Sequence, residues 1–575
     1  MSVFCAYHGP MTASVTLDDD ACYRALCSHD ARFDGRFFTA VTSTGIYCRP
    51  VCRVRTPRRE NCRFFAHAAQ AEHAGFRPCL RCRPELAPLE RHWSSTDATT
   101  ILLQQATLWM DDPQHWLDDA TSLGTRLAQR LGVSDRHLRR VFEDGLGVSP
   151  LQYLLTRKLL TAKQLLADTD LPITQIALAS GFGSVRRFNA AFVEHYRLNP
   201  TQLRRQSTAG THDRSQGTAV RLGYRPPYDL AATLGFFEQR QLQGLSFVDA
   251  PQARLGQTLR MNLGGLVSQG WWVAEFDEAR SQVVLRVSDT LRAALPQVIH
   301  RLRAALDLDA DPAAINAVLH GPFPQGDGLR VPGALDGFEL AVRAVLGQQI
   351  TVAAARTLAQ RLVNHFGEAI DTPFDTLTRL FPTPQALAQA DGDALGQLGI
   401  VRQRQAAIVA LARAVAEHGL LLHGSADVPS TIAALKALPG IGDWTAQYIA
   451  MRALRWPDAF PAGDVALHKA LGVQTLKHPA REAEALSQAW KPWRSYAVIR
   501  AWATEQSPLE LTADAVDVFP APWQIMIMRL ARTPALVHAY ASLTEVLRPT
   551  DFRRLDELSV EDWTFHLSVL YGTTL

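Results

Sequence analysis

Gly45-Ile46-Tyr47-Cys48-Arg49-Pro50-Val51-Cys52 is the stretch that decides the fold of the N-terminal part of this chain, and Arg77-Pro78-Cys79-Leu80-Arg81-Cys82 echoes it. The cysteines arrive as C-x3-C and C-x2-C, with 26 residues between the pairs. Each short pair can place two sulfurs on one edge of a tetrahedral zinc ion, and the connecting segment brings the two edges together. We therefore expect one Zn2+ ion, held by Cys48, Cys52, Cys79 and Cys82.

Two disulfides or four buried thiols are the alternatives to this metal site. No export signal opens the chain, and the remaining cysteines form no matching pairs; they are Cys5, Cys22, Cys27 and Cys62. Disulfides are rare in reducing compartments. The pattern therefore favours zinc in a cytoplasmic protein.

The segment around these cysteines is basic. Between Gly45 and Arg91, ten arginines stand against four glutamates, with no lysine or aspartate, which gives a net charge of +6. Such a surface suits phosphate, and we expect Arg49 and Arg55 to contact DNA. The words Thr44-Gly45-Ile46-Tyr47-Cys48-Arg49-Pro50 and Ala74-Gly75-Phe76-Arg77-Pro78-Cys79 resemble the Ada-type methylphosphotriester repair domain, from roughly Phe33 to Pro88. The resemblance implies that Cys48 is both a zinc ligand and an irreversible methyl acceptor.

The charge of such a site can report damage. Four thiolates on Zn2+ carry −2, which repels ordinary phosphates but not a neutral triester, and methylation of Cys48 leaves −1. One charge removed at ~8 Å from a phosphate, at a dielectric constant of ~20, is worth ~2 kcal/mol before salt screening. We expect methylation to raise the affinity for DNA.

Length and composition limit the number of domains and the class of protein. A chain of 575 residues is too long for one core and indicates three to five domains. The content of 47% hydrophobic and 20% charged residues is typical of globular proteins, and the net charge of only +3 requires local basic patches for DNA binding. No run is apolar enough for a membrane span, so we expect a bacterial-type cytoplasmic, nucleoid-associated protein without membrane contact. We expect residues 1–14 to form a disordered leader and residues 15–92 to form the zinc module.

Two helix-turn-helix units follow, in residues 93–205. In each, a glycine-containing turn precedes a serine N-cap, Ser134 in the first unit and Ser184 in the second. A long amphipathic helix from Leu151 to Leu166 separates them. The helices after the caps carry basic residues, among them Arg136, Arg139, Arg186 and Arg187.

A solvated helix face is the alternative for these basic residues. Duplication about 50 residues apart favours two major-groove readers instead. From about Thr96 to Arg205 the stretch resembles the AraC-type DNA-binding domain, which in the Ada family follows the zinc module. Promoter DNA and RNA polymerase are then expected partners.

Residues 206–217 read as a polar linker. Alternating patterns between 218 and 290 predict a small antiparallel α+β domain with a helix at Leu230 to Gln239. From 291 to 506 the chain is rich in alanine and leucine and predicts helices. Residues 507–575 carry no functional signal, although Trp563, Leu567 and Leu570 stand at helical spacing.

The helical region contains Leu438-Pro439-Gly440-Ile441-Gly442 between two helical segments. Gly440 and Gly442 would let a DNA phosphate approach backbone N–H groups at a helix start, although a tight helix connection is the alternative. Asp464 follows 24 residues after Gly440, and the combination resembles the helix-hairpin-helix DNA glycosylases. An N-cap is the alternative for Asp464.

Further words point to the AlkA-type 3-methyladenine branch, from roughly Tyr224 to Glu505; they are Pro226-Pro227-Tyr228-Asp229, Val345-Leu346-Gly347-Gln348-Gln349, Trp444-Thr445-Ala446-Gln447-Tyr448 and Trp490-Lys491-Pro492-Trp493-Arg494-Ser495-Tyr496. This resemblance implies that Asp464 is the catalytic carboxylate and that Gln349 lies at the wedge that replaces a flipped base. It also implies a base pocket of Trp444, Tyr448, Trp502 and Phe236, each with core packing as the alternative. Trp444 occupies the position of the lysine used by strand-cleaving relatives, so a monofunctional glycosylase is expected.

The sequence thus predicts a multidomain, mainly α protein: a small α+β zinc module, two helix-turn-helix units, a small antiparallel α+β domain and a helix-hairpin-helix glycosylase domain. We expect a monomer that repairs alkylated double-stranded DNA and regulates transcription. A regulator with an inactive glycosylase fold, and a non-enzymatic DNA-binding protein with a structural zinc, are the alternatives. The sequence contains no Pro-Cys-His-Arg motif, so the O6-alkylguanine transferase half of Ada is not expected.

Overall fold

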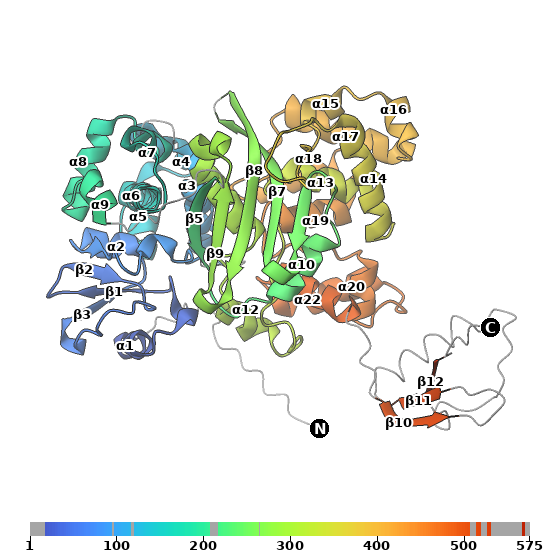
Figure 1. Ribbon diagram of the computed structural model, residues 1–575, viewed down its shortest axis with the longest axis horizontal. Coiled ribbons are helices and arrows are strands. Elements are labelled where there is room, and N and C mark those ends of the chain that lie inside the picture. The colour runs from blue at the N-terminus through green and yellow to red at the C-terminus, as the bar shows by residue number, and fades with distance from the viewer. Residues whose placement is uncertain are drawn as a thin grey trace, which may run out of the picture. The chain divides into compact units, whose positions relative to one another are not determined.

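The computed structural model describes residues 18–91, 93–94, 97–116, 120–206, 217–263 and 265–506, and three strands beyond them. The chain divides into two units, Met1–Trp502 and Ala503–Leu575 (Figure 1). The expected leader and nearly all of the expected linker lie outside the described residues. None of the described helices combines the length and apolar character that a membrane span requires.

The N-terminal module is a small α+β fold, as predicted. Its four-stranded sheet has the order β3-β1-β2-β4 and is flanked by two helices. The elements are α1 (Asp19–Ser28), β1 (Phe38–Val41), β2 (Ile46–Cys48), β3 (Cys62–Phe65), α2 (Ala68–His73) and β4 (Arg77–Pro78). Strands β2 and β4 are parallel, with Tyr47 opposite Pro78, so Cys48 and Cys79 emerge at the same end of the sheet.

Seven helices form the next region and confirm the two helix-turn-helix units. They are α3 (Ala98–Asp111), α4 (Ala120–Arg130), α5 (Asp135–Leu146), α6 (Pro150–Asp168), α7 (Ile173–Ala179), α8 (Val185–Tyr196) and α9 (Pro200–Gln206). Ser134 and Ser184 accept hydrogen bonds from the backbone N–H groups of His137 and Arg187, which fixes the starts of α5 and α8. The long helix α6 lies between the two units in the chain and buries most of its leucines.

A five-stranded antiparallel sheet of order β5-β9-β8-β7-β6 follows (Figure 1). Its elements are β5 (Thr218–Gly223), α10 (Leu230–Glu238), β6 (Ser246–Asp249), β7 (Arg254–Leu263), β8 (Leu266–Asp277) and β9 (Gln282–Val287). Strands β6, β7 and β9 overlap the three stretches in which apolar and polar residues alternate, Leu245 to Asp249, Ala253 to Leu259 and Val283 to Val287. The sequence did not single out β5 and β8, because β8 contains a run of five buried residues in which no polar side chain alternates.

The last described region of the first unit is helical. Its helices are α11 (Leu295–Ala305), α12 (Pro312–Leu319), α13 (Gly337–Leu346), α14 (Val352–Phe366), α15 (Pro384–Ala388), α16 (Gly392–Gln397), α17 (Arg402–Ala416), α18 (Val428–Lys436), α19 (Asp443–Arg452), α20 (Val465–Ala470), α21 (Pro479–Ser487) and α22 (Arg494–Gln506). The connection between α18 and α19 is the glycine hairpin that the sequence predicted. Two buried clusters, one around α13 and α17 and one around α19 and α22, hold these helices together.

Buried ion pairs join the N-terminal module to helix α6. Lys163 pairs with Glu85, and Arg83 pairs with Asp168 at 2.6 Å. Both α6 side chains and Glu85 are at most 2% exposed. These charges are therefore paired out of water, where removal of one partner is costly.

The second unit contains three antiparallel strands, β10 (Ala513–Val518), β11 (Met526–Leu530) and β12 (His566–Val569), in this order. The helical stripe suggested by Trp563, Leu567 and Leu570 is wrong at Leu567, which lies in β12. Cross-strand pairing with Met528 replaces a helix there. Trp563 and Leu570 lie outside the described residues.

Candidate metal centre and candidate active site

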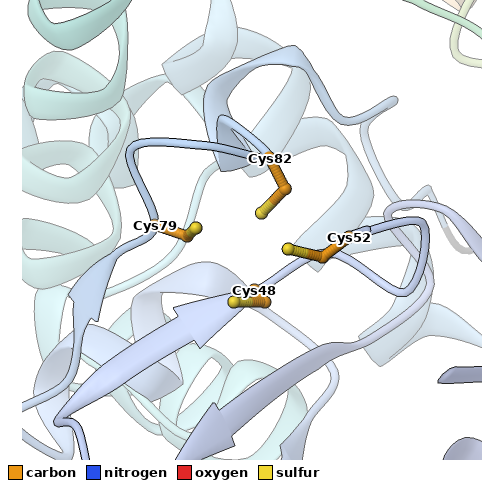
Figure 2. Close-up of side chains that lie close together, drawn as sticks. All are labelled: Cys48, Cys52, Cys79 and Cys82. Atoms are coloured by element: carbon orange, nitrogen blue, oxygen red, sulfur yellow. The ribbon is translucent and has the colours of Figure 1, made fainter. Parts of the chain in front are cut away.

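The four cysteines of the two short pairs come together. Their sulfur atoms all lie within 4.8 Å of one another, and Figure 2 shows them converging, with Cys48 at the end of β2 and the other three on the loops that follow β2 and β4. Cys48, Cys52 and Cys79 are at most 7% exposed, and Cys82 is half buried. No described cysteine forms a disulfide. Four sulfurs at this separation match the edges of a tetrahedral zinc site.

The thiols compete for protons in this arrangement. Hydrogen bonding with Cys52 and Cys79 raises the pKa of Cys48, whereas hydrogen bonds from Cys48 and Cys52 lower the pKa of Cys79. Packed thiols alone thus cannot all ionise. A divalent cation removes this conflict, because it favours every thiolate at once, so the donor set fits Zn2+.

Arg49 belongs to the interior of this centre. It is 5% exposed, and its Nε donates to Asp34 Oδ1 at 2.8 Å while its Nη1 donates to the Cys82 carbonyl at 3.1 Å. The expectation that Arg49 contacts DNA is corrected here, because Asp34 draws its guanidinium inward. Arg55 is exposed, as a phosphate contact requires.

The predicted DNA-reading arginines lie on the two helices that follow the serine caps. Arg136 and Arg139 are exposed on α5, and Arg139 pairs with Glu143 at 3.5 Å. Arg186 and Arg187 are exposed on α8. All four therefore lie on the solvent side of a second helix of a helix-turn-helix.

The glycine hairpin between α18 and α19 lies next to Gln349, the predicted wedge residue. Gly440 has φ of 75°, where only glycine is unstrained, and a Cβ there would lie 3.1 Å from Ala407 Cβ. Gly442 is the N-cap of α19 and leaves this helix start without a side-chain cap. Gln348 Nε2 donates to the Gly440 carbonyl and to Thr445 Oγ1, each at 2.9 Å, so it connects the hairpin to exposed Gln349.

Asp464 is the N-cap of α20 and is 9% exposed. Its Oδ1 accepts from the Leu467 N–H at 2.7 Å and from Trp502 Nε1 at 3.0 Å. Its Oδ2 accepts from Trp444 Nε1 at 2.8 Å. The carboxylate is thus both the helix cap that the sequence allowed and the partner of two of the predicted pocket tryptophans.

The predicted pocket aromatics come together around this carboxylate. The rings of Trp444 and Tyr448 stack at 5.3 Å and 19°, and Trp502 lies 6.2 Å from Tyr448. Phe236, from α10, reaches them through Arg452, whose guanidinium lies 4.7 Å from its ring and 5.2 Å from Tyr448. All four aromatic side chains are only partly buried, which leaves ring area for a ligand.

Two arginines that sequence reasoning missed lie against these aromatic rings. Arg240 lies 3.7 Å from the Phe236 ring centre, and Arg452 donates to the Tyr448 hydroxyl. Burial lowers the pKa of Arg240 to about 10 and also lowers that of Arg452. Burial alone would raise the pKa of Tyr448, but Arg452 and Arg240 outweigh it, so the pKa is lowered. The i, i+4 spacing of Phe236 and Arg240 was the available signal.

Four segments of the chain match known families. Residues 21–85 match the metal binding domain of Ada, and residues 127–206 match a helix-turn-helix domain. Residues 219–336 match the AlkA N-terminal domain, and residues 342–495 match the HhH-GPD superfamily base excision DNA repair protein. The matches confirm the resemblances inferred from the sequence.

A Mycobacterium tuberculosis protein, described as a probable bifunctional transcriptional activator/DNA repair enzyme AlkA, is 37% identical over 503 residues. These residues cover 86% of this chain and 97% of that protein. The chain belongs to this family. DNA-3-methyladenine glycosylase 2 of Escherichia coli is 35% identical over 49% of this chain and 96% of its own length. The activator and repair enzyme Ada of E. coli is 33% identical over 30% of this chain and 45% of its own length.

The bifunctional family thus combines, in this chain, an Ada-type zinc-binding domain, a helix-turn-helix domain and a DNA glycosylase domain. The helix-turn-helix and glycosylase domains make DNA a partner of this chain. Each domain contains its own group of candidate functional residues: the four cysteines, the exposed arginines of α5 and α8, and Asp464 with its aromatic neighbours.

Proposed function

We propose that this protein repairs alkylated DNA by two chemistries and regulates transcription with the same chain. Cys48 takes methyl groups from phosphotriesters, and Asp464 promotes hydrolytic release of alkylated bases such as 3-methyladenine. Alkylated duplex DNA, promoter DNA and RNA polymerase are the proposed partners of a monomeric chain. One Zn2+ per chain is the proposed cofactor.

The backbone donors around the four sulfurs support Cys48 as the methyl acceptor. The N–H of Arg49 donates to Cys82 Sγ at 3.3 Å, and the N–H of Arg81 donates to Cys79 Sγ at 3.4 Å. Hydrogen bonding with Cys48 lowers the pKa of Cys52 most, and a backbone hydrogen bond from Val54 lowers it further. In the described part of the chain, no backbone N–H donates to Cys48 Sγ. A thiolate without such donors keeps its charge available and is the better nucleophile.

The reaction at Cys48 is a single displacement. Bound Zn2+ would keep the sulfur ionised at neutral pH. The sulfur lone pair forms a bond to the methyl carbon, the bond from carbon to the phosphate oxygen breaks, and a phosphodiester anion leaves. The carbon–sulfur bond of the resulting thioether is stable to hydrolysis, so the transfer occurs once per molecule.

The position of Asp464 carries the glycosylase proposal. Three N–H donors hold the carboxylate oriented beside the aromatic rings. When a flipped nucleotide loses its base, the sugar develops positive charge, which this carboxylate stabilises while water adds to C1′. Alkylation at a purine ring nitrogen makes the base cationic, and the faces of Trp444 and Trp502 suit such bases. Trp444 offers no amine to attack the sugar, so hydrolysis without strand cleavage is expected.

The remaining predicted residues position DNA. The uncapped start of α19 would offer backbone N–H groups to a phosphate, and exposed Gln349 would enter the duplex where the nucleotide leaves. Arg55 is a phosphate contact of the zinc domain. Arg136, Arg139, Arg186 and Arg187 are the proposed groove contacts.

Release of 3-methyladenine from alkylated duplex tests the enzymatic half of this proposal. Asp464→Asn keeps the shape of the side chain but removes its charge, so we expect a loss of roughly 100-fold or more. The matched control is Asp375→Asn, at an exposed aspartate outside the pocket. Undiminished release by Asp464→Asn would overturn the assignment.

A further inference from the structure

A cavity lies where the zinc module, the helix-turn-helix region and the glycosylase region meet. Its walls include Arg91 and Trp93 from the segment after the zinc module, Leu108 from α3, and residues of α11, α19 and α22. Its volume is about 80 Å³, whereas one ordered water needs only about 10–15 Å³ on the same scale. Asp464 and the aromatic side chains around it do not line this cavity. The space therefore admits a small molecule and is separate from the candidate active site.

Four aromatic side chains line the cavity. The rings of Trp93 and Trp456 meet edge to face, with their centres 5.8 Å apart at 83°, and both side chains are only partly buried. Trp493 and Tyr496 are buried beside them. A cavity at a domain junction that combines aromatic walls with a few polar groups is typical of a site for a flat organic ligand.

The backbone of two polar residues in this cavity is strained. Arg455 has φ of 58° and Asp307 has φ of 54°, a left-handed conformation that is uncommon outside glycine. Arg455 Nη2 donates to Asp307 Oδ1 at 3.0 Å, so the two strained residues hold each other. Gly333 makes room for this guanidinium, since a Cβ there would lie 2.9 Å from Nη1. Strain of this kind is concentrated at ligand and active sites.

The hydrogen-bonding capacity left over in the cavity is a donor. Arg455 Nη1 is buried, and among the described residues it has no hydrogen-bond acceptor. Asp307, in contrast, already accepts from the Tyr496 hydroxyl at 2.9 Å and from the Val331 N–H at 3.2 Å, in addition to Arg455. A ligand that completes this site must therefore bring an acceptor atom.

The charge of the cavity disfavours a highly charged ligand. Arginine and aspartate side chains line it in equal numbers; they are Arg91, Arg303, Arg455, Asp307, Asp309 and Asp311. Two of the arginines are paired within the cavity, Arg303 with Asp309 and Arg455 with Asp307. A phosphate would meet these carboxylates as well as the guanidinium groups, whereas a neutral ring with acceptor nitrogens would not be repelled.

We propose that this cavity is a second ligand site and that it binds a free purine base. A purine is flat, is neutral at physiological pH and carries ring nitrogens that accept hydrogen bonds. One of these nitrogens accepts from Arg455 Nη1, while the ring packs against Trp456. The bound base contacts three regions of the chain at once, so it stabilises their junction. Excision would produce such a base, and only this source of the ligand rests on the proposed glycosylase function.

Titration calorimetry of the zinc-loaded full chain with adenine tests this inference. Arg455→Met removes the free donor, so we expect adenine to bind roughly 10-fold more weakly. Ala304→Leu fills the cavity from α11 without removing a charge, and it should abolish binding there. Trp444→Ala removes a ring of the proposed active site and should leave binding at the cavity unchanged. Arg280→Met, at an exposed arginine, is the matched control for the loss of a guanidinium.

Two results would overturn the inference. Adenine binding that persists in Ala304→Leu but disappears in Trp444→Ala would place the base in the active site alone. Absence of binding by the unmodified chain, up to the solubility limit of adenine, would show that the cavity takes no purine. Because the base is supplied free, neither result depends on excision, and the proposed function is tested separately by base release from alkylated duplex.

Discussion

Arg225 donates a hydrogen bond of 2.8 Å from Nε to the backbone carbonyl of Asp34, a residue 191 positions earlier in the chain. The arginine is fully buried at the start of the glycosylase region, and the carboxylate of Asp34 in turn binds Arg49 beside the zinc cysteines. Its remaining donors reach the carbonyls of Pro88, Leu89, Asp309 and Ala310 and the carboxylate of Glu90. One guanidinium thus joins the zinc domain to the glycosylase domain.

Arg225→Met should destabilise the folded chain. It leaves several buried acceptors without a donor, which we expect to cost about 3 kcal/mol and to expose the segment around Pro88 to protease. Thermal unfolding and limited proteolysis measure both effects. Arg280→Met is the control, because Arg280 is 74% exposed and its pair with Asp277 is worth less than about 1 kcal/mol. Equal stability of the two variants would show that the buried contact is unimportant.

Trp502→Phe should weaken base excision while it leaves the fold intact. Asp464 loses one of its three hydrogen bonds, so its carboxylate is less well held in place. We expect kcat/KM to fall roughly 10-fold at neutral pH. Trp456→Phe, at a tryptophan that packs against Trp93, is the comparison. A normal rate for Trp502→Phe would remove this tryptophan from the site.

Acid should destabilise the contact between the helix-turn-helix and glycosylase regions. Ser425 Oγ lies 3.3 Å from His115 Nε2 and 2.9 Å from His423 Nδ1, and it donates to Asp112 at 3.0 Å. Burial lowers the pKa of His115 and of His423 to about 4. The charged or titratable neighbours of the two rings are Asp112, His300, Arg126, Arg130 and Arg301.

The direction of the pH effect follows from these pKa values. The folded protein keeps both imidazoles neutral, whereas the unfolded chain protonates them below about pH 6.5. The two neutral rings therefore add their full contribution to the free energy of unfolding above about pH 6.5. This contribution is lost as the pH falls toward about 4, by up to about 3 kcal/mol for each ring. Tm should therefore drop between about pH 7.5 and about pH 5. The double variant His115→Gln/His423→Gln should show a smaller drop, and an equal drop would contradict the assignment.

Removal of a zinc ligand should unfold the N-terminal module. We expect one zinc per chain by metal analysis, and Cys52→Ser should lose the ion because its sulfur is 2% exposed among the other three. Cys27→Ser is the control, since Cys27 is exposed and lies outside the cluster. Full zinc content in Cys52→Ser would contradict the four-cysteine site.

Local patterns predicted the elements that carry these sites. The spacing of Cys48, Cys52, Cys79 and Cys82 predicted that they come together, because two closely spaced cysteine pairs are typical of a metal site. Gly440 predicted the hairpin, since its positive φ is a local requirement. Ser134 and Ser184 predicted the starts of α5 and α8, because an N-cap hydrogen bond also depends only on residues close in the sequence.

Contacts between distant segments were not predictable in this way. Phe236 and Arg452 meet only after the sheet and helical regions have folded together, and no periodicity links them. The basic stretch around Arg49 indicated an exposed side chain, but Asp34 draws this arginine inward. Leu567 stood at helical spacing with its neighbours, yet pairing with β11 decides its conformation.

Mass spectrometry of the zinc-loaded protein after incubation with duplex DNA that carries a methylphosphotriester is the most direct test of methyl capture at Cys48. The account predicts one added methyl group per chain on the peptide that contains Cys48, and none in Cys48→Ser. A methyl group on Cys52, Cys79 or Cys82 instead, or no transfer to a fully zinc-loaded chain, would contradict it.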